Sequence, residues 1–189
     1  MNKSILSMIL ILNMSCNSDK KQPLDEMASI ETSVQKDQGL ENDKMYKWFT
    51  TESYELKFEI NEIENAVYEL VLSMDLRNDS YYVSPNSKGD FTGIFTIIIN
   101  DNEKLKKIAK PIETPLSNEE YDPHPFVNGF VNWVKETTTY KQQIQRKSDE
   151  DFEVSGIIQF TIEPKCTLEK VPFFIKYKNG ELIVEVARC

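Results

Sequence analysis

The sequence predicts an all-β protein with an immunoglobulin-like two-sheet sandwich, and three observations carry this expectation. Residues 54–60 and 66–76 alternate between apolar and polar side chains, which is the period of a half-buried strand. Asn179-Gly180 separates two further apolar segments, and this dipeptide favours a type I′ hairpin turn because both of its residues tolerate positive φ. About seven or eight such segments follow at short spacing without a long amphipathic helix, as in a sandwich.

The remaining segments complete the sandwich in chain order. Residues 61–65 are polar and predict the turn between the first two strands. The segment 94–99 is apolar without alternation, which predicts a strand covered on both faces. Residues 110–125 hold Pro111, Pro115, Pro123 and Pro125, too many prolines for a central strand, so this segment is expected to cross between sheets or to cover one end. The other expected strands are residues 126–134, 138–144, 152–162, 171–177 and 181–186.

Composition excludes several classes of function. The chain has 189 residues and a net charge of -9, and an acidic surface repels phosphate backbones, so no nucleic-acid partner is expected. Its single histidine, His124, excludes sites that need two or more histidine ligands. None of its six glycines belongs to a nucleotide-binding or nucleophile-elbow motif. We therefore expect neither a cofactor nor a metal.

The N-terminus has the pattern of an export signal. Lys3 precedes the apolar residues 5–12, which are too few to span a bilayer. A small residue followed by Cys16 then resembles a bacterial lipobox, in which the cysteine is lipidated and becomes the mature N-terminus. The alternative is an ordinary signal peptide with an incidental cysteine. Lipidation is the preferred interpretation, since an odd cysteine in an exported chain needs an explanation.

Three regions follow from these patterns. Residues 1–15 are the predicted lipoprotein signal peptide, and 44–189 are the predicted β-sandwich domain. The segment 16–43 is rich in Ser, Gln, Asp, Glu and Lys and lacks aromatic residues, so it cannot bury enough apolar surface to offset its ordering entropy. It is expected to be a flexible acidic tether. The predicted location is the bacterial cell envelope, with a lipid anchor in the membrane and the domain facing the periplasm or the cell surface.

Several segments, in order, resemble the N-terminal periplasmic domain of the DsbD thiol:disulfide interchange proteins. They are residues 79–86, 110–113, 140–144, 152–160 and 166–173, the last beginning with Cys166 and running Cys-Thr-Leu-Glu-Lys-Val-Pro-Phe. The resemblance covers roughly residues 46–183, most of the expected domain. It implies an immunoglobulin-like sandwich that takes part in thiol-disulfide interchange. The implied partner is a thioredoxin-like protein or another envelope protein.

One departure from the family affects the chemistry. The family's redox loop holds two cysteines, whereas this chain has only Cys166, with Ile162 or Glu163 where the first should be. A dithiol exchanger needs a second thiol to resolve the mixed disulfide. If residues 178 and 181 pair across the Asn179-Gly180 turn, Cys189 faces residue 170, four residues from Cys166, and a bend of the loop could join the two sulfurs.

Two interpretations of Cys166 and Cys189 stay open. In the first, a structural disulfide closes 22 intervening residues and contributes on the order of 3 kcal/mol. In the second, the same two cysteines are the exchangeable, catalytic couple. The structural bond is preferred because most disulfides in exported domains are structural. The corresponding functions are thiol-disulfide interchange, a redox-inactive relative that binds a partner protein, or a non-catalytic immunoglobulin-like binding module.

Two other groups of side chains have simpler explanations. Glu119, Glu120, Asp122 and His124 could form a cation site, or His124 could act as a general base, but solvated loop residues are the preferred interpretation. Aromatic side chains are expected mainly in the core, although some could line a groove for a partner. Those considered are Tyr81, Tyr82, Phe91, Phe126, Phe130, Trp133 and Tyr140.

Overall fold

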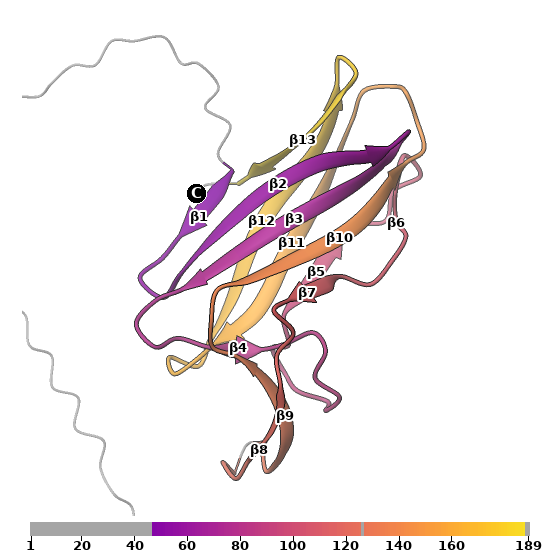
Figure 1. Ribbon diagram of the computed structural model, residues 1–189. Helices are drawn as coiled ribbons and strands as arrows, with labels where there is room; N and C mark the ends of the chain where they lie inside the picture. Colours follow the sequence, from indigo (N-terminus) through magenta and orange to yellow (C-terminus); the bar gives the residue numbers. More distant parts are fainter. Residues whose placement is uncertain (1–46, 126, 188–189) are drawn as a thin grey trace, which may run out of the picture. The chain divides into compact units, whose positions relative to one another are not determined.

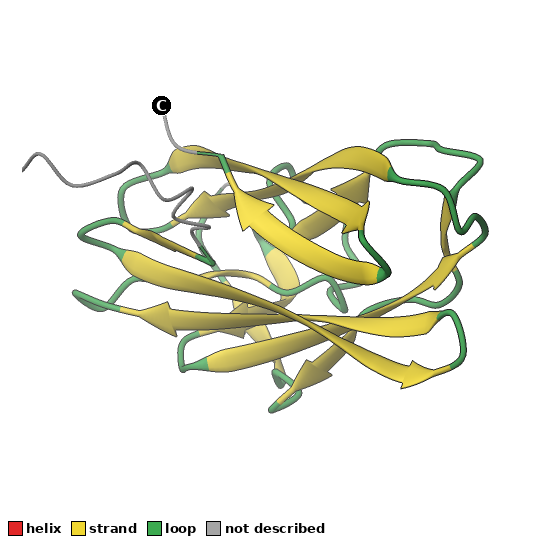
Figure 2. Cartoon of the chain, turned by 90° about the horizontal axis from the view of Figure 1, so that it is seen from above, coloured by secondary structure: helices red, strands yellow, loops and turns green. Residues whose placement is uncertain are grey.

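The computed structural model describes residues 47–125 and 127–187, which form strands and loops without a helix (Figures 1 and 2). The predicted signal peptide, Cys16, the predicted tether and Cys189 lie outside the described residues. No described segment forms a helix with the length and apolar character that crossing a membrane requires.

The first sheet is antiparallel, with strand order β1-β2-β3-β10-β6, and β7 also pairs with β10. β2 and β3 form the hairpin that their alternating side chains predict, and β10 pairs with β3 from Thr138↔Met74 to Gln145↔Val67. The strands are β1 (Trp48–Thr50), β2 (Tyr54–Glu64), β3 (Val67–Leu76), β6 (Leu105–Lys107), β7 (Ile112–Thr114) and β10 (Thr138–Arg146).

The second sheet is also antiparallel and follows the order β13-β12-β11-β5. The predicted hairpin is confirmed: Asn179 and Gly180 have φ of 53° and 84°, and Lys178 pairs with Glu181. The strands are β5 (Thr96–Ile99), β11 (Phe152–Ile162), β12 (Thr167–Lys178) and β13 (Glu181–Val186).

A small third sheet, β4-β9-β8, lies near the turn between β11 and β12 (Figure 1). Its strands are β4 (Tyr82–Val83), β8 (Glu119–Asp122) and β9 (Gly129–Val134). The sequence predicted only two sheets, with 126–134 and 138–144 as successive strands. The structure instead places β9 in the third sheet and β10 in the first. The proline-rich segment crosses between sheets, which is one of its two expected roles: its strand β7 pairs with β10 of the first sheet, and its strand β8 pairs with β9 of the third.

One hydrophobic cluster joins the inward side chains of the two large sheets, which makes the domain an immunoglobulin-like β-sandwich. Its largest fully buried side chains are aromatic, and they include Phe58 of β2 and Phe173 of β12, whose rings are tilted by 42° with centroids 5.5 Å apart. Gly156 on β11 allows this packing, because a Cβ there would lie 2.3 Å from the Phe173 ring and 2.7 Å from the Ile98 carbonyl oxygen. The all-β sandwich predicted from the sequence is therefore confirmed.

Two local predictions were wrong. β5 is not covered on both faces: Thr96 and Ile98 are exposed, because β5 pairs only with β11 among the described strands and only one of its faces meets the core. Residues 61–65 are not all turn, because β2 continues to Glu64 through a bulge and the chain reverses at Ala66, with φ of 61°. Backbone pairing there outweighs the polar character of the side chains.

A buried polar network crosses the core near β7. The hydroxyls of Tyr82 and Tyr140 lie 2.9 Å apart, and burial is the main reason that both of their pKa values are raised. Glu113 is 6% exposed and accepts hydrogen bonds from Ser84 Oγ at 2.5 Å and from the Ser117 backbone N–H at 2.8 Å. The network holds β4, β7 and β10 together, because each buried polar group would otherwise lose its partner.

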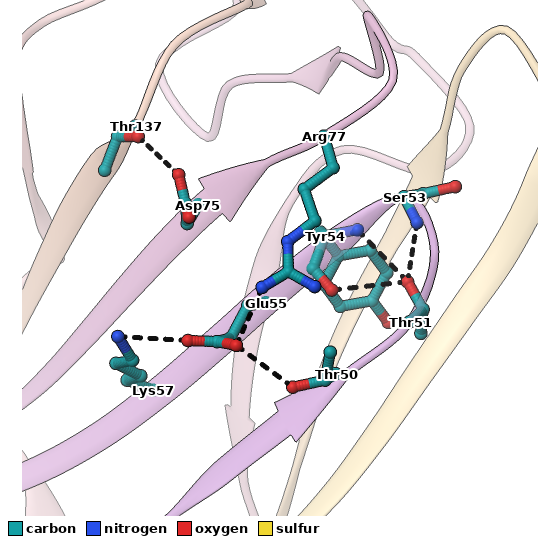
Figure 3. Close-up of polar contacts among 9 residues, drawn as sticks. All are labelled: Thr50, Thr51, Ser53, Tyr54, Glu55, Lys57, Asp75, Arg77 and Thr137. Carbon is teal, nitrogen blue, oxygen red and sulfur yellow. Dashed lines mark hydrogen bonds and ion pairs between the residues drawn. The ribbon is translucent and has the colours of Figure 1, made fainter.

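Polar side chains also tie the start of β2 to its neighbours (Figure 3). Thr51 Oγ1 accepts hydrogen bonds from the backbone N–H groups of Ser53 and Tyr54, both at 3.1 Å. On the exposed face, the Glu55 carboxylate contacts Lys57 at 3.0 Å and Arg77 at 2.8 Å. These contacts fix the entry of the chain into the sandwich, and Tyr54 then reaches Glu169 of β12 with its hydroxyl at 3.0 Å.

Candidate functional site

Cys166 lies in the tight turn between β11 and β12, where its side chain is exposed. Its φ is 52°, a left-handed conformation that L-residues other than glycine, asparagine and aspartate rarely adopt. It is the only cysteine among the described residues and forms no disulfide with any of them. The turn therefore presents a thiol to the solvent at one end of the sandwich.

The turn is held against the connection between β3 and β4. Tyr81 N–H donates to the Glu163 carbonyl at 3.0 Å, and Glu163 N–H donates to the Tyr81 carbonyl at 2.8 Å. This isolated bridge extends the end of β11 onto the strand that leads into the small third sheet. The bridge therefore fixes the position of the Cys166 turn next to the third sheet.

The third sheet supplies an aromatic wall beside this bridge. The rings of Tyr81 and Trp133 meet edge to face, with centroids 5.0 Å apart and planes at 88°. Trp133 Nε1 donates to Asp122 Oδ2 at 3.1 Å, and the backbone N–H of His124 donates to Asp122 Oδ1 at 2.8 Å. Asp122 of β8 thereby fixes both the indole of β9 and the start of the loop that follows.

These groups surround a cavity of about 740 Å³. The loop before β5 closes another side of it with Phe91. Gly93, with φ of 86°, lets this loop approach β11, since a Cβ would lie 1.9 Å from Thr161 Oγ1. The cavity is lined by Tyr81, Val83, Asp90, Phe91, Thr92, Asp122, His124, Val127, Trp133, Thr161, Glu163, Pro164, Cys166 and Leu168.

The lining is negatively charged. Asp90, Asp122 and Glu163 supply three carboxylates, and none of the described lining residues is a lysine or an arginine. The pKa of Tyr81 is raised, first by burial and then by the negative charges of Glu163 and Asp122. The nearby Lys135 is paired with Glu120 at 2.5 Å and opposes this effect only in part.

The structure brings together some of the predicted residues and separates others. Cys166 and His124, distant in sequence, line the same cavity. Glu119 instead points to Lys88 at 3.5 Å, and Glu120 to Lys135, so the acidic segment does not converge on one point. Within residues 47–125 and 127–187, no group of three or more His, Cys, Asp or Glu side chains is arranged to hold a metal ion.

The aromatic side chains also separate into groups. Tyr81, Phe91 and Trp133 line the cavity, whereas Tyr82 and Tyr140 are core residues. Phe130 is exposed and packs on Tyr121, and Phe126 lies outside the described residues. Sequence reasoning missed Asp90 and Leu168 as site residues. Asp90 belongs to no motif, and Leu168 lies in the segment 166–173 but carries no reactive or charged group, so only the folding of distant segments onto one cavity identifies them.

The strand register sets a condition for the expected Cys166–Cys189 bond. The pairing of β12 with β13 extends to Ala187, whose N–H donates to the Pro172 carbonyl at 3.0 Å. Cys166 lies about 20 Å from Pro172 along the strand, at 3.3 Å per residue, whereas two residues beyond Ala187 reach at most about 7 Å. A disulfide needs Cα atoms within about 7 Å. The bond therefore requires this end of the ladder to open. Cys189 itself lies outside the described residues, so the pairing stays a prediction.

The fold and the cavity define a class of protein: an immunoglobulin-like β-sandwich with an exposed thiol at one end. No family model matches the chain, and neither does any curated protein. Among solved structures, the GAE domain of GGA2p from Saccharomyces cerevisiae is similar at a TM-score of 0.37 and 11% identity. The match covers 74% of this chain and 94% of that chain, and at this TM-score it carries no argument about function.

Proposed function

We propose that this chain is an envelope lipoprotein whose β-sandwich domain takes part in thiol-disulfide interchange with a partner protein through Cys166. The observation that carries the proposal is the exposed Cys166 thiol at the edge of a cavity large enough to accept part of another chain. The resemblance of residues 46–183 to the DsbD N-terminal domain supports the same reaction. The lipid anchor rests on the sequence pattern around Cys16.

The chemistry needs only one thiol from this domain. The Cys166 thiolate attacks one sulfur of a partner disulfide, so a bond forms between Cys166 and that sulfur while the other partner sulfur leaves as a thiolate. A reduced thioredoxin-like protein then attacks the Cys166 sulfur and releases the partner's second thiolate. Its own second thiol finally displaces Cys166, so the thioredoxin-like protein is oxidised and the partner is reduced.

The strand register of β12 and β13 favours an exchangeable Cys166, because a structural Cys166–Cys189 bond requires the end of the ladder between these two strands to open. Cys189 is then available as an alternative resolving thiol when that end of the ladder opens. In the absence of redox activity, the same cavity would serve a binding module, and the exposed pair of Tyr121 and Phe130 favours this second candidate function.

Mass spectrometry of the intact mature protein tests the reaction. After incubation with oxidised glutathione, we expect one glutathione adduct, mapped to Cys166 and removed by a reduced thioredoxin. Cys166→Ser abolishes this adduct, and Cys189→Ser leaves it in place. Wild-type protein that carries only a Cys166–Cys189 bond, resistant to thioredoxin, would support the binding module instead. Lipidation is read from the mass of the N-terminal peptide of membrane-extracted protein.

A further inference from the structure

We propose that the cavity beside Cys166 accepts a lysine or arginine side chain of the partner segment whose disulfide Cys166 attacks. This inference rests on the proposed function and names the chemistry of the partner. It depends on three features of the cavity: its negative charge, its aromatic wall and the position of the thiol on its edge.

The first feature is charge. Asp122 and Glu163 are half-buried and Asp90 is exposed, and all three line the cavity without a lysine or arginine among the described lining residues. Half-buried carboxylates are only partly screened by water, so they favour an incoming cation more strongly than surface carboxylates do. The two lysines nearest in sequence to these groups already have carboxylate partners: Lys88 contacts Glu119 at 3.5 Å, and Lys165 contacts Glu52.

The second feature is the aromatic wall. Tyr81 and Trp133 stand perpendicular to each other, and Phe91 lines the cavity from a separate loop. Ring faces attract cations, and tryptophan does so most strongly. Asp122 uses both carboxylate oxygens to fix this wall, through Trp133 Nε1 and the His124 backbone N–H. The indole is thus held in place before a ligand arrives.

The third feature is the position of the reacting atom. Cys166 and Glu163 lie in the same turn, and both line the cavity. A cationic side chain that enters the cavity therefore brings the neighbouring cysteine of the same segment to the Cys166 thiol. Holding the reactants side by side in this way lowers the entropic part of the barrier. The cavity would select partners whose disulfide has a basic neighbour.

Matched peptide disulfides test the inference. The probes are disulfide dimers of three tetrapeptides, Gly-Arg-Cys-Gly, Gly-Gln-Cys-Gly and Gly-Glu-Cys-Gly, acetylated and amidated at their ends. With the full mature protein in its reduced form, we expect the arginine probe to form the Cys166 mixed disulfide about tenfold faster than the glutamine probe, which corresponds to about 1.4 kcal/mol. The glutamate probe should be the slowest.

Charge-matched variants distinguish the effect of the cavity carboxylates on the preference for arginine from the effect of the protein's overall negative charge. Asp90→Asn/Glu163→Gln should reduce the preference for arginine over glutamine to about twofold or less, while Asp122 keeps the wall in place. The control Asp101→Asn/Glu181→Gln removes the same charge from exposed positions outside the lining and should keep the preference. If both double variants lost the preference for the arginine probe equally, the inference would be overturned, because long-range attraction to the acidic protein would then explain the preference.

The remaining outcomes distinguish the two proposals. Equal rates for all three probes with wild-type protein would overturn the cationic cavity and leave the exchange reaction intact. If no probe reacts, the proposed exchange fails. The cavity is then tested by calorimetry, with Cys166→Ser protein and the same peptides carrying serine in place of cysteine. Tighter binding of the arginine peptide supports the cavity on its own, and equal binding overturns it.

Discussion

Tyr81 and Glu163 exchange both of their backbone hydrogen bonds, at 3.0 and 2.8 Å, and this bridge joins the end of β11 to the approach of the third sheet. Tyr81 carries an edge-to-face contact to Trp133, and Glu163 begins the turn that ends at Cys166. A single backbone bridge therefore positions the thiol beside the aromatic wall. The bridge uses backbone atoms only. Side-chain substitutions at Tyr81 or Glu163 can therefore test the cavity while the bridge stays in place.

The left-handed conformation of Cys166 predicts an unusual effect on stability. Glycine adopts φ of 52° without the Cβ clash, so Cys166→Gly should raise the free energy of unfolding by about 0.5–1 kcal/mol relative to Cys166→Ser. Urea titration of both variants measures the difference. Reductant should leave the wild-type midpoint unchanged. A marked loss of stability in both variants, equal to that of reduced wild type, would instead show that Cys166 forms a structural disulfide.

The buried tyrosines predict a loss of stability at alkaline pH. The pKa values of Tyr54, Tyr82 and Tyr140 are raised, mainly by burial, so the folded protein keeps protons that the unfolded chain releases above about pH 10. Above that pH, each of these tyrosines therefore lowers the free energy of unfolding by about 1.4 kcal/mol per pH unit, and below it their contribution to stability is fully present. Tyrosinate absorbance and denaturant titration from pH 8 to 12 measure the effect. Tyr140→Phe should make the decline shallower, and Tyr121→Phe, at an exposed position, should not.

The carboxylate of Glu113 predicts a large cost of truncation. Glu113→Ala removes the acceptor for Ser84 Oγ, which is buried, and for the N–H of Ser117, which is half-buried. We expect a loss of about 2–4 kcal/mol in the free energy of unfolding. Glu113→Gln keeps one acceptor oxygen and should lose less. An unchanged urea midpoint in the alanine variant would show that the network contributes nothing.

Gly156 predicts a steric effect in the core. A methyl group there meets Phe173 and the Ile98 carbonyl, so Gly156→Ala should destabilise the protein by about 1–3 kcal/mol. Gly129→Ala is the matched control, because the nearest atom is the Val127 carbonyl oxygen at 3.4 Å. Thermal unfolding of the two variants provides the comparison. Similar melting temperatures would contradict the tight packing of β5, β11 and β12.

The strands and their hairpins could be predicted from the sequence because their causes are local. Alternation at residues 54–60 reports one buried face, and Asn179-Gly180 supplies the positive φ values that a two-residue turn needs. The register of β12 and β13 follows from that turn alone. Cys166 could also be selected from the sequence, since it is one of only three cysteines in the chain.

Only the tertiary structure decided what surrounds that thiol. The third sheet, the contact of Tyr81 with Trp133 and the presence of Asp90 in the cavity depend on segments that are distant along the chain. Periodicity reports whether a residue faces a core, but it does not report which other loop it meets. Local sequence thus determined the strands and the turn that carries Cys166, whereas long-range pairing determined the charge and shape of the cavity next to it.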